Sequence, residues 1–148
     1  MGYVEQNLLQ GEEVVYRARL HLIIFLVPAL VAVLGVIAFA ASGKLAALLL
    51  VIALLLAVDR YIRLATSEFA VTNKRVLIKI GLVQRHTLEL LLGKVETIGV
   101  EQGISGRIFN YGTIVVTGTG GTKELFPVIA RPLEFRKAVQ ERAGRVEL

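Results

Sequence analysis

The sequence predicts an α+β membrane protein: a small domain of seven strands and a C-terminal helix, with a hairpin of two apolar helices inserted after the first strand. Three observations support this fold class. The stretch Leu20–Val58 is apolar, and Lys44 is its one charged residue. Alternating apolar and polar residues precede that stretch and return from Ser67 onward, which is typical of half-buried strands. The segment that begins at Pro132 has apolar residues at helical spacing instead.

The apolar stretch divides at Ser42-Gly43, a pair that favours a tight turn because Gly tolerates positive φ. A helix needs roughly 20 apolar residues to cross the hydrocarbon core of a bilayer. The first arm, Leu20–Ala41, meets that length, whereas the second arm, Leu45–Val58, falls short unless it extends through Ile62. We therefore expect two crossings, with a re-entrant hairpin as the alternative. Pro28 predicts a kink in the first arm.

Four arginines flank the two arms at the ends away from the turn: Arg17, Arg19, Arg60 and Arg63. The turn itself contains one basic residue, Lys44. Positively charged residues favour the cytoplasmic side. We expect both termini to be cytoplasmic and Lys44 to face outward. The polar segment Met1–Arg19 before the apolar stretch argues against a cleaved signal peptide.

Bulk composition excludes several classes of protein. The chain has 148 residues, 55% of them hydrophobic, no cysteine and a formal net charge of +5. A chain without cysteine forms no disulfide and no thiolate metal site. A basic domain held against an anionic leaflet is expected from membrane electrostatics. Without a basic helix or zinc-finger spacing, the charge does not indicate nucleic-acid binding.

We expect four segments along the chain: an N-terminal lead at 1–11, a domain built from 12–19 and 67–143, the membrane hairpin at 20–58 and a basic neck at 59–66. Strands are predicted at 13–19, 67–72, 75–80, 85–91, 94–102, 113–117 and 122–126. In the first of them, Val14, Tyr16 and Ala18 share one face. In the third and fourth, Val76, Ile78, Ile80, His86, Leu88 and Leu90 are predicted to point inward.

Two segments depart from simple alternation. Val95 falls on the face opposite Ile98, which predicts either a bulge near Glu96-Thr97 or burial of both faces. The loop 103–112 places Ile104 and Ile108 four residues apart, a spacing that allows one helical turn. At the end of the chain, Pro132 fits a first helical position, and an apolar stripe follows at Phe135, Ala138, Val139 and Ala143.

Several of these segments resemble a known family. The run Phe69-Ala70-Val71-Thr72-Asn73-Lys74-Arg75-Val76, the following Gly81, Lys94-Val95-Glu96-Thr97-Ile98, and the loop Gly106-Arg107…Tyr111-Gly112-Thr113 are similar to the bacterial pleckstrin-homology-like (PH-like) domain of small membrane proteins. The resemblance implies a curved seven-stranded sheet or barrel, capped by a C-terminal helix, and no enzyme activity. In eukaryotic PH domains, the loop between the first two strands commonly contributes to phosphoinositide binding. Here the hairpin lies between the first two strands, so the phosphoinositide-binding site of those domains is not expected in this chain.

The sequence contains few residues and no motifs of the kinds that enzymes use for catalysis. The chain has two histidines, His21 and His86, and we expect both in the core or at an interface. Its one aspartate, Asp59, is placed to pair with Arg60 or Arg63. No nucleophile elbow or paired-ligand spacing occurs, and 118–123 favours a turn over a phosphate loop. We expect no catalytic residues, no metal and no cofactor.

Binding is the remaining class of function. Candidate lipid- or partner-binding residues are Arg60, Arg63, Arg75, Lys79, Arg85, Arg107, Phe109 and Tyr111. Arg75, Lys79 and Arg85 share the outward face of two strands, which predicts either a contact with anionic headgroups or an acidic partner, or an ordinary solvated face. Phe109 and Tyr111, beside Arg107, predict either an exposed anchor or a plug for the open end of the barrel.

The sequence therefore predicts a non-enzymatic, membrane-anchored PH-like module in the bacterial cytoplasmic membrane. Its expected partners are the lipid bilayer and another membrane protein, an anionic lipid or further copies of itself in a homo-oligomer, with no nucleic acid. The alternative is a small two-span oligomeric channel. Neither arm carries a polar stripe, which argues against a channel, but a hydrophobic gate that works by dewetting leaves it open.

Overall fold

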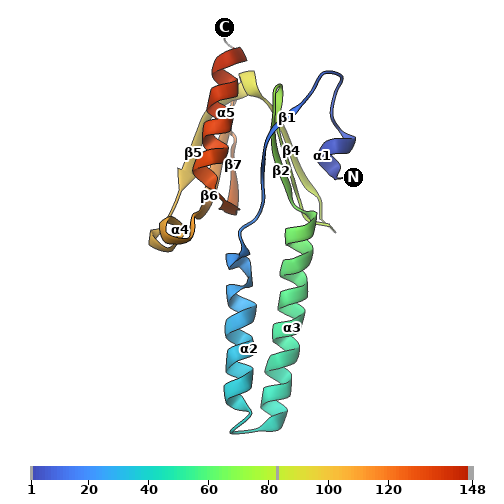
Figure 1. The fold of residues 1–148 in the computed structure, drawn as a ribbon, viewed down its shortest axis with the longest axis vertical. Helices are drawn as coiled ribbons and strands as arrows, with labels where there is room; N and C mark the ends of the chain where they lie inside the picture. Colours follow the sequence, from blue (N-terminus) through green and yellow to red (C-terminus); the bar gives the residue numbers. More distant parts are fainter. Residues whose placement is uncertain (1, 83, 147–148) are drawn as a thin grey trace. The chain divides into compact units, whose positions relative to one another are not determined.

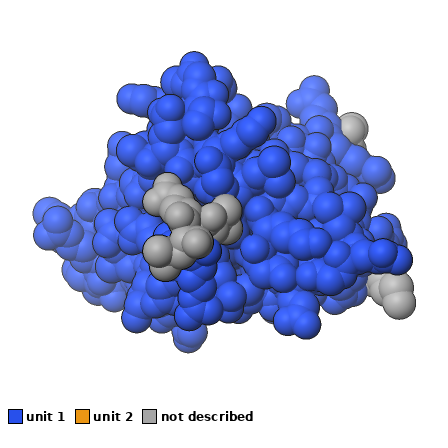
Figure 2. Space-filling model, turned by 90° about the horizontal axis from the view of Figure 1, so that it is seen from above, with its two compact units in different colours: residues 1–21, 66–148 blue, residues 22–65 orange. Residues whose placement is uncertain are grey.

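The computed structural model describes residues 2–82 and 84–146 and divides into two compact units, which are considered separately (Figure 1). Unit 1 comprises residues 1–21 and 66–148, and unit 2 comprises residues 22–65. Figure 2 shows unit 1 in blue. The division follows the sequence pattern, because unit 1 contains the alternating segments and unit 2 contains most of the apolar stretch.

The described part of unit 1 contains seven strands in two antiparallel sheets. The first sheet has the order β1 (Val14–Ala18), β2 (Glu68–Thr72), β3 (Arg75–Ile80) and β4 (His86–Leu91). The second has the order β5 (Val95–Glu101), β6 (Tyr111–Gly118) and β7 (Lys123–Ala130). A short 3-10 turn, η2 (Leu92–Lys94), joins the two sheets. The α+β fold class is confirmed.

Unit 2 is inserted between two strands that pair with each other. Arg17 of β1 lies opposite Ala70 of β2, and Ala18 lies opposite Phe69. The chain continues beyond β1 as a bridge between Leu20 and Ile129 of the second sheet. The inserted residues therefore leave unit 1 and return to it at neighbouring positions of one sheet.

The core of unit 1 lies between the two sheets and is closed by α5 (Pro132–Val146), which packs against β5, β6 and β1 (Figure 1). Phe135 and Val139 of α5 are completely buried in this core. The rings of Phe69 and Phe126 pack edge to face across it, with their centres 6.3 Å apart. The predicted stripe of α5 is the face that packs on the sheets, because burial of one apolar face is what fixes a helix on a sheet.

The other face of the first sheet is also covered. The N-terminal helix α1 (Tyr3–Gln6) places Val4 against Ala70 and Leu77. Ala70 and Leu77 are fully buried, although the alternation predicts that they point outward. The N-terminal lead supplies the cover, and such long-range packing has no local signature.

Three positions differ from or refine the predicted pattern. A bulge between Val14 and Tyr16 turns Val14 toward the α1 side of the sheet. The predicted bulge in β5 is confirmed between Val95 and Thr97, and both Val95 and Ile98 pack against the core. His86, predicted to point inward, lies at the start of β4 with 59% of its side chain exposed, and its Nε2 is 3.4 Å from Glu124. The end of the strand extends past the cover of the core.

Unit 2 is a hairpin of two apolar helices. A 3-10 turn, η1 (Leu22–Phe25), leads into α2 (Leu26–Ala38), and α3 (Gly43–Thr66) follows the turn. The 24 residues of α3 span about 36 Å at 1.5 Å per residue. The sequence predicts the opposite order of lengths, because the second arm is predicted to end at Val58 unless it extends through Ile62. In the structure Asp59 and Arg60 continue α3 through the residues predicted as a neck.

Among the described residues, α3 is the one helix with both the length and the apolar composition to cross a membrane, and the apolar helix 22–38 is shorter. Pro28 explains the difference. It is the third residue of α2, and its ring is incompatible with an α-helical carbonyl four residues earlier. Pro28 therefore lies in the first turn of α2, and the residues before this helix form the 3-10 turn η1 instead of extending it.

The turn between the helices also differs in detail from the prediction. Ser42 is the N-cap of α3, where its Oγ accepts the amide N–H of Leu45 at 3.5 Å. Gly43 is the first residue of α3 and does not have a positive φ. The buried residues of the two helices are small or cyclic: Pro28, Gly35, Ala46 and Ala53. A Cβ at Gly35 would lie 3.1 Å from the side chain of Leu50 in α3, so the two helices are close together there.

Candidate functional site

Arg75, a predicted binding residue, is held inside unit 1. Its Nε lies 3.0 Å from Glu12 Oε1, and its Nη1 lies 2.6 Å from Glu89 Oε2. The Arg75 side chain is 11% exposed, and the Glu12 side chain is fully buried. Glu12 also accepts hydrogen bonds from the amide of Leu9 and the hydroxyl of Thr72, at 2.8 and 2.7 Å. This ion pair fastens the N-terminal segment to β2 and β3.

The ionisation of this pair follows from its contacts. Burial by itself raises the pKa of the Glu12 carboxyl, but the hydrogen bonds from Arg75, Leu9 and Thr72 outweigh burial and hold that pKa below its usual value. The hydrogen bond to Glu12 raises the pKa of the Arg75 guanidinium. Both groups are therefore charged at neutral pH. A buried charged pair of this kind holds two segments of chain in one register.

The pH dependence of stability has a defined sign at Glu12. Because its folded-state pKa is lowered, the carboxylate stabilises the fold above the unfolded pKa of about 4.3 and loses that contribution as pH falls through the folded pKa. Glu12→Gln is expected to unfold at lower urea concentration than the natural chain at pH 7, and the gap is expected to close below about pH 4. Tyrosine fluorescence of the full chain in mild detergent reports the transition.

The exposed neighbour Glu13 provides the matched control for this measurement. Glu13→Gln is expected to leave the urea midpoint nearly unchanged across the same pH range. A pH-dependent gap of equal size in both variants would show that general charge, and not the buried pair, sets the acid sensitivity.

The other predicted basic residues of the first sheet do not join Arg75 in one free patch. The Lys79 ammonium lies over the ring of Tyr3, 5.6 Å from its centre. Arg85 is exposed and lies just before β4. The outward face of β3 and β4 is thus partly occupied by the N-terminal segment. In unit 2, Arg60 and Arg63 lie on α3 and pair with Asp59 at 3.7 and 3.2 Å.

A second group of predicted residues meets at the short helix α4 (Ile104–Phe109) and the start of β6. Gln102 Nε2 donates hydrogen bonds to the carbonyl oxygens of Gly106 and Tyr111, at 3.2 and 3.0 Å. The helix ends at Asn110, which adopts the left-handed conformation with φ of 57°. The predicted helical turn is confirmed, and its ends are tied together by one glutamine side chain that the sequence pattern did not single out.

Gly106 is essential to this loop. A Cβ at Gly106 would lie 2.5 Å from the carbonyl oxygen of Tyr111, and one at Gly112 would lie 2.8 Å from that of Glu101. A Cβ at Gly112 would also lie 2.7 Å from Cγ of Gln102, but both oxygens belong to the backbone, so the backbone itself would have to move. The glycines of the Gly106-Arg107…Tyr111-Gly112 motif are therefore explained by steric contact.

Gly106→Ala is expected to lower the free energy of unfolding by about 1–3 kcal/mol, because the added methyl overpacks the loop against backbone. Gly144→Ala is the matched control, since a Cβ at that position of α5 meets open space. That change is expected to be neutral or slightly stabilising, because alanine favours helix over glycine. Equal losses in urea unfolding of the two variants would contradict the steric explanation.

The predicted residues of this loop have different environments. Tyr111 is half-buried, its hydroxyl lies 2.8 Å from Ser105 Oγ, and its ring centre is 5.2 Å from that of His21. Phe109 is 55% exposed. Arg107 is exposed and lines an open groove of about 750 Å³. Tyr111 therefore supports the loop, while Phe109 and Arg107 are presented to the outside.

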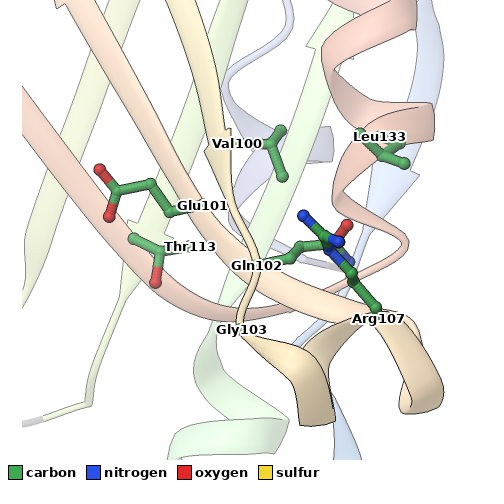
Figure 3. Close-up of a pocket in the computed structure, with 7 residues that line it drawn as sticks. All are labelled: Val100, Glu101, Gln102, Gly103, Arg107, Thr113 and Leu133. Atoms are coloured by element: carbon green, nitrogen blue, oxygen red, sulfur yellow. The ribbon is translucent and has the colours of Figure 1, made fainter.

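Figure 3 shows how the groove is built. Val100 and Leu133 lie on one side of β5, and Glu101 and Thr113 turn to the other side, as expected for successive residues of a strand. Arg107 extends from α4 beside Gln102. The groove combines the apolar side chains of Val100 and Leu133 with the polar side chains of Glu101, Gln102, Arg107 and Thr113. Among the described residues, no cluster of acidic or histidine side chains suits a metal ion.

Comparison with known proteins places the chain in a family. The model of the bacterial PH domain matches residues 22–145, which include the apolar hairpin, β2 to β7 and nearly all of α5. No curated protein and no solved structure is significantly similar to the chain. The match and the two-sheet fold with its C-terminal helix agree with the resemblance seen in the sequence. The chain belongs to the bacterial PH domain family.

Proposed function

We propose that this chain is a non-enzymatic binding module tethered to the bacterial cytoplasmic membrane by its helical hairpin. In this proposal unit 1 lies in the cytoplasm and engages another membrane protein, an anionic lipid or a further copy of the chain. Membership of the PH-like family favours a binding or adaptor module, since such domains are generally non-catalytic.

The observation that carries the proposal is the apolar surface of unit 2. Large apolar side chains are exposed along both helices, among them Leu30, Val33, Leu34, Ile37, Leu48, Val51, Leu54 and Leu55. Soluble monomers rarely expose contiguous apolar patches beyond a few hundred Å². A bilayer solvates such a surface, and the length of α3 exceeds the roughly 30 Å of the hydrocarbon core.

Strand pairing supports an even number of crossings. β1 and β2 flank the hairpin in sequence and form one antiparallel pair, so both ends of the insertion must be on the same side of the membrane. A single crossing would separate the two strands by the bilayer. Two helices therefore favour two crossings. The arginines at the ends of the hairpin, against Lys44 at its turn, favour the cytoplasm for unit 1.

Cysteine labelling tests this topology, because the natural chain has no cysteine. Ser42→Cys and Gln140→Cys place single thiols at the hairpin turn and on the exposed face of α5. In bacteria with a permeabilised outer membrane, a membrane-impermeant maleimide is expected to label Ser42→Cys directly and Gln140→Cys only after lysis. The reverse pattern would overturn the orientation, and recovery of the chain in the soluble fraction would overturn the tether.

A further inference from the structure

The short helix α4 presents three large apolar side chains on its outside. Ile104, Ile108 and Phe109 are 83%, 71% and 55% exposed, and we refer to them as the α4 tip. Ile104 and Ile108 are four residues apart and lie on one face of the helix. Phe109 follows directly and is also exposed, so this short helix carries three exposed apolar side chains on the surface of unit 1.

The α4 tip is held outward by the loop that carries it. Gln102 ties the carbonyl oxygens of Gly106 and Tyr111 together, and Ser105 Oγ contacts the hydroxyl of Tyr111. The carbonyl of Asn110 also accepts the amide N–H of Arg131 at 3.0 Å. With both ends fixed in this way, the three apolar residues have no short path back into the core.

The position of the loop within unit 1 indicates what the tip contacts. Tyr111, directly beyond α4, stacks against His21, the last residue of unit 1 before the apolar hairpin. His21 itself donates its amide N–H to Val128 of β7 at 2.8 Å, and the carbonyl of Arg19 accepts the amide of Ala130 at 2.9 Å. The tip is thus carried by the same edge of unit 1 from which the chain enters the hairpin.

We infer that the α4 tip inserts into the headgroup and acyl boundary of the bilayer that holds the hairpin. This inference rests on the proposed function, since it needs the hairpin to be in a membrane. Three side chains are too small a patch for a stable protein interface, which buries about 1,200 Å² or more. Apolar residues flanked by a cation are the pattern of an interfacial membrane contact.

The tip adds a third point of attachment to the two chain connections at His21 and Thr66. Two neighbouring connections leave a domain free to tilt about the line that joins them. In this proposal the tip is a third contact that restricts the tilt, and with it the face that unit 1 presents to a partner. The tip therefore sets orientation more than it adds to anchoring.

Spin labels on single cysteines test the inference in the full chain reconstituted into vesicles of phosphatidylcholine and phosphatidylglycerol. The variants are Ile108→Cys in the tip, Val33→Cys in the hairpin and Gln140→Cys on the exposed side of α5. Oxygen concentrates in the bilayer and a nickel chelate stays in water. The ratio of oxygen to nickel accessibility is expected to be several-fold higher at positions 108 and 33 than at 140.

Each outcome separates the two proposals. A low ratio at 108 with a high ratio at 33 would overturn the insertion of the tip and leave the tether standing. A low ratio at 33 would overturn the tether itself, and the tip with it. Shielding of 108 from both reagents would show a protein contact instead of lipid, and a high ratio at 140 as well would show that the bilayer contact is not specific to the tip.

Discussion

Replacing Arg75 with methionine is expected to lower the free energy of unfolding by about 3–5 kcal/mol, because the change leaves the buried carboxylate of Glu12 without its partner. Methionine keeps most of the side-chain volume, so the loss reports the charge and its hydrogen bonds. The N-terminal segment, which Glu12 and Arg75 fasten to β3, is expected to lose protection first. Hydrogen exchange of the amides of β3 and of residues 3–13 measures both effects.

Two variants decide between a buried pair and a general charge effect. Arg85→Met removes an exposed arginine near β4 and is expected to change stability by no more than about 0.5 kcal/mol. The double variant Glu12→Gln with Arg75→Met is expected to be more stable than Arg75→Met alone, since no unpaired charge remains. If the double variant were less stable than Arg75→Met, the stranded charge could not be the cause.

Phe135→Ala is expected to cost about 3–5 kcal/mol, because it leaves a cavity where α5 closes the space between the two sheets. The Phe135 ring is completely buried and packs edge to face against Tyr16 of β1, with ring centres 6.2 Å apart. One side chain thus joins the last helix to the first strand. Losing it is expected to weaken both attachments together.

Urea unfolding of the full chain in detergent, followed by tyrosine fluorescence, measures this loss. Leu133→Ala, two residues earlier on α5, is the matched control because Leu133 is 46% exposed. That change is expected to cost less than about 1 kcal/mol, since little apolar area returns to water. Because alanine favours helix more than phenylalanine or leucine does, helix propensity cannot cause a loss, and a comparable loss at both positions would contradict the core-packing explanation.

Much of the fold was readable from local pattern. Alternation located β2, β3 and the inward pair Val76 and Ile78, and the misplaced Val95 revealed the bulge in β5. The burial of Leu77 and Ala70 was not readable, because their cover comes from a helix more than sixty residues earlier in the chain. The length of α2 was misjudged for a similar reason: the apolar stretch was predicted to begin at Leu20, but Leu20 and His21 pair with β7.

The candidate site also has parts that the local sequence pattern predicted and parts that it did not. Arg107 and Phe109 stood out by residue type, and the spacing of Ile104 and Ile108 predicted their helix. Their exposure did not follow, because apolar residues at helical spacing usually mark a buried face. Glu12 was missed altogether. The pair Glu12-Glu13 is typical of a solvated surface, and only the fold brings Arg75 to Glu12.

The insertion of the hairpin between paired strands has a consequence for biosynthesis. β1 leaves the ribosome first, but its partner β2 is synthesised only after the whole hairpin. β2, β3 and β4 can pair at once through short turns, so β1 is the strand that joins late. If the hairpin is inserted in a membrane as proposed above, β1 can reach β2 only when the hairpin has returned the chain to the side on which it started. A complete sheet then requires a correctly inserted hairpin, and a wrongly inserted chain keeps the edge of β2 unpaired.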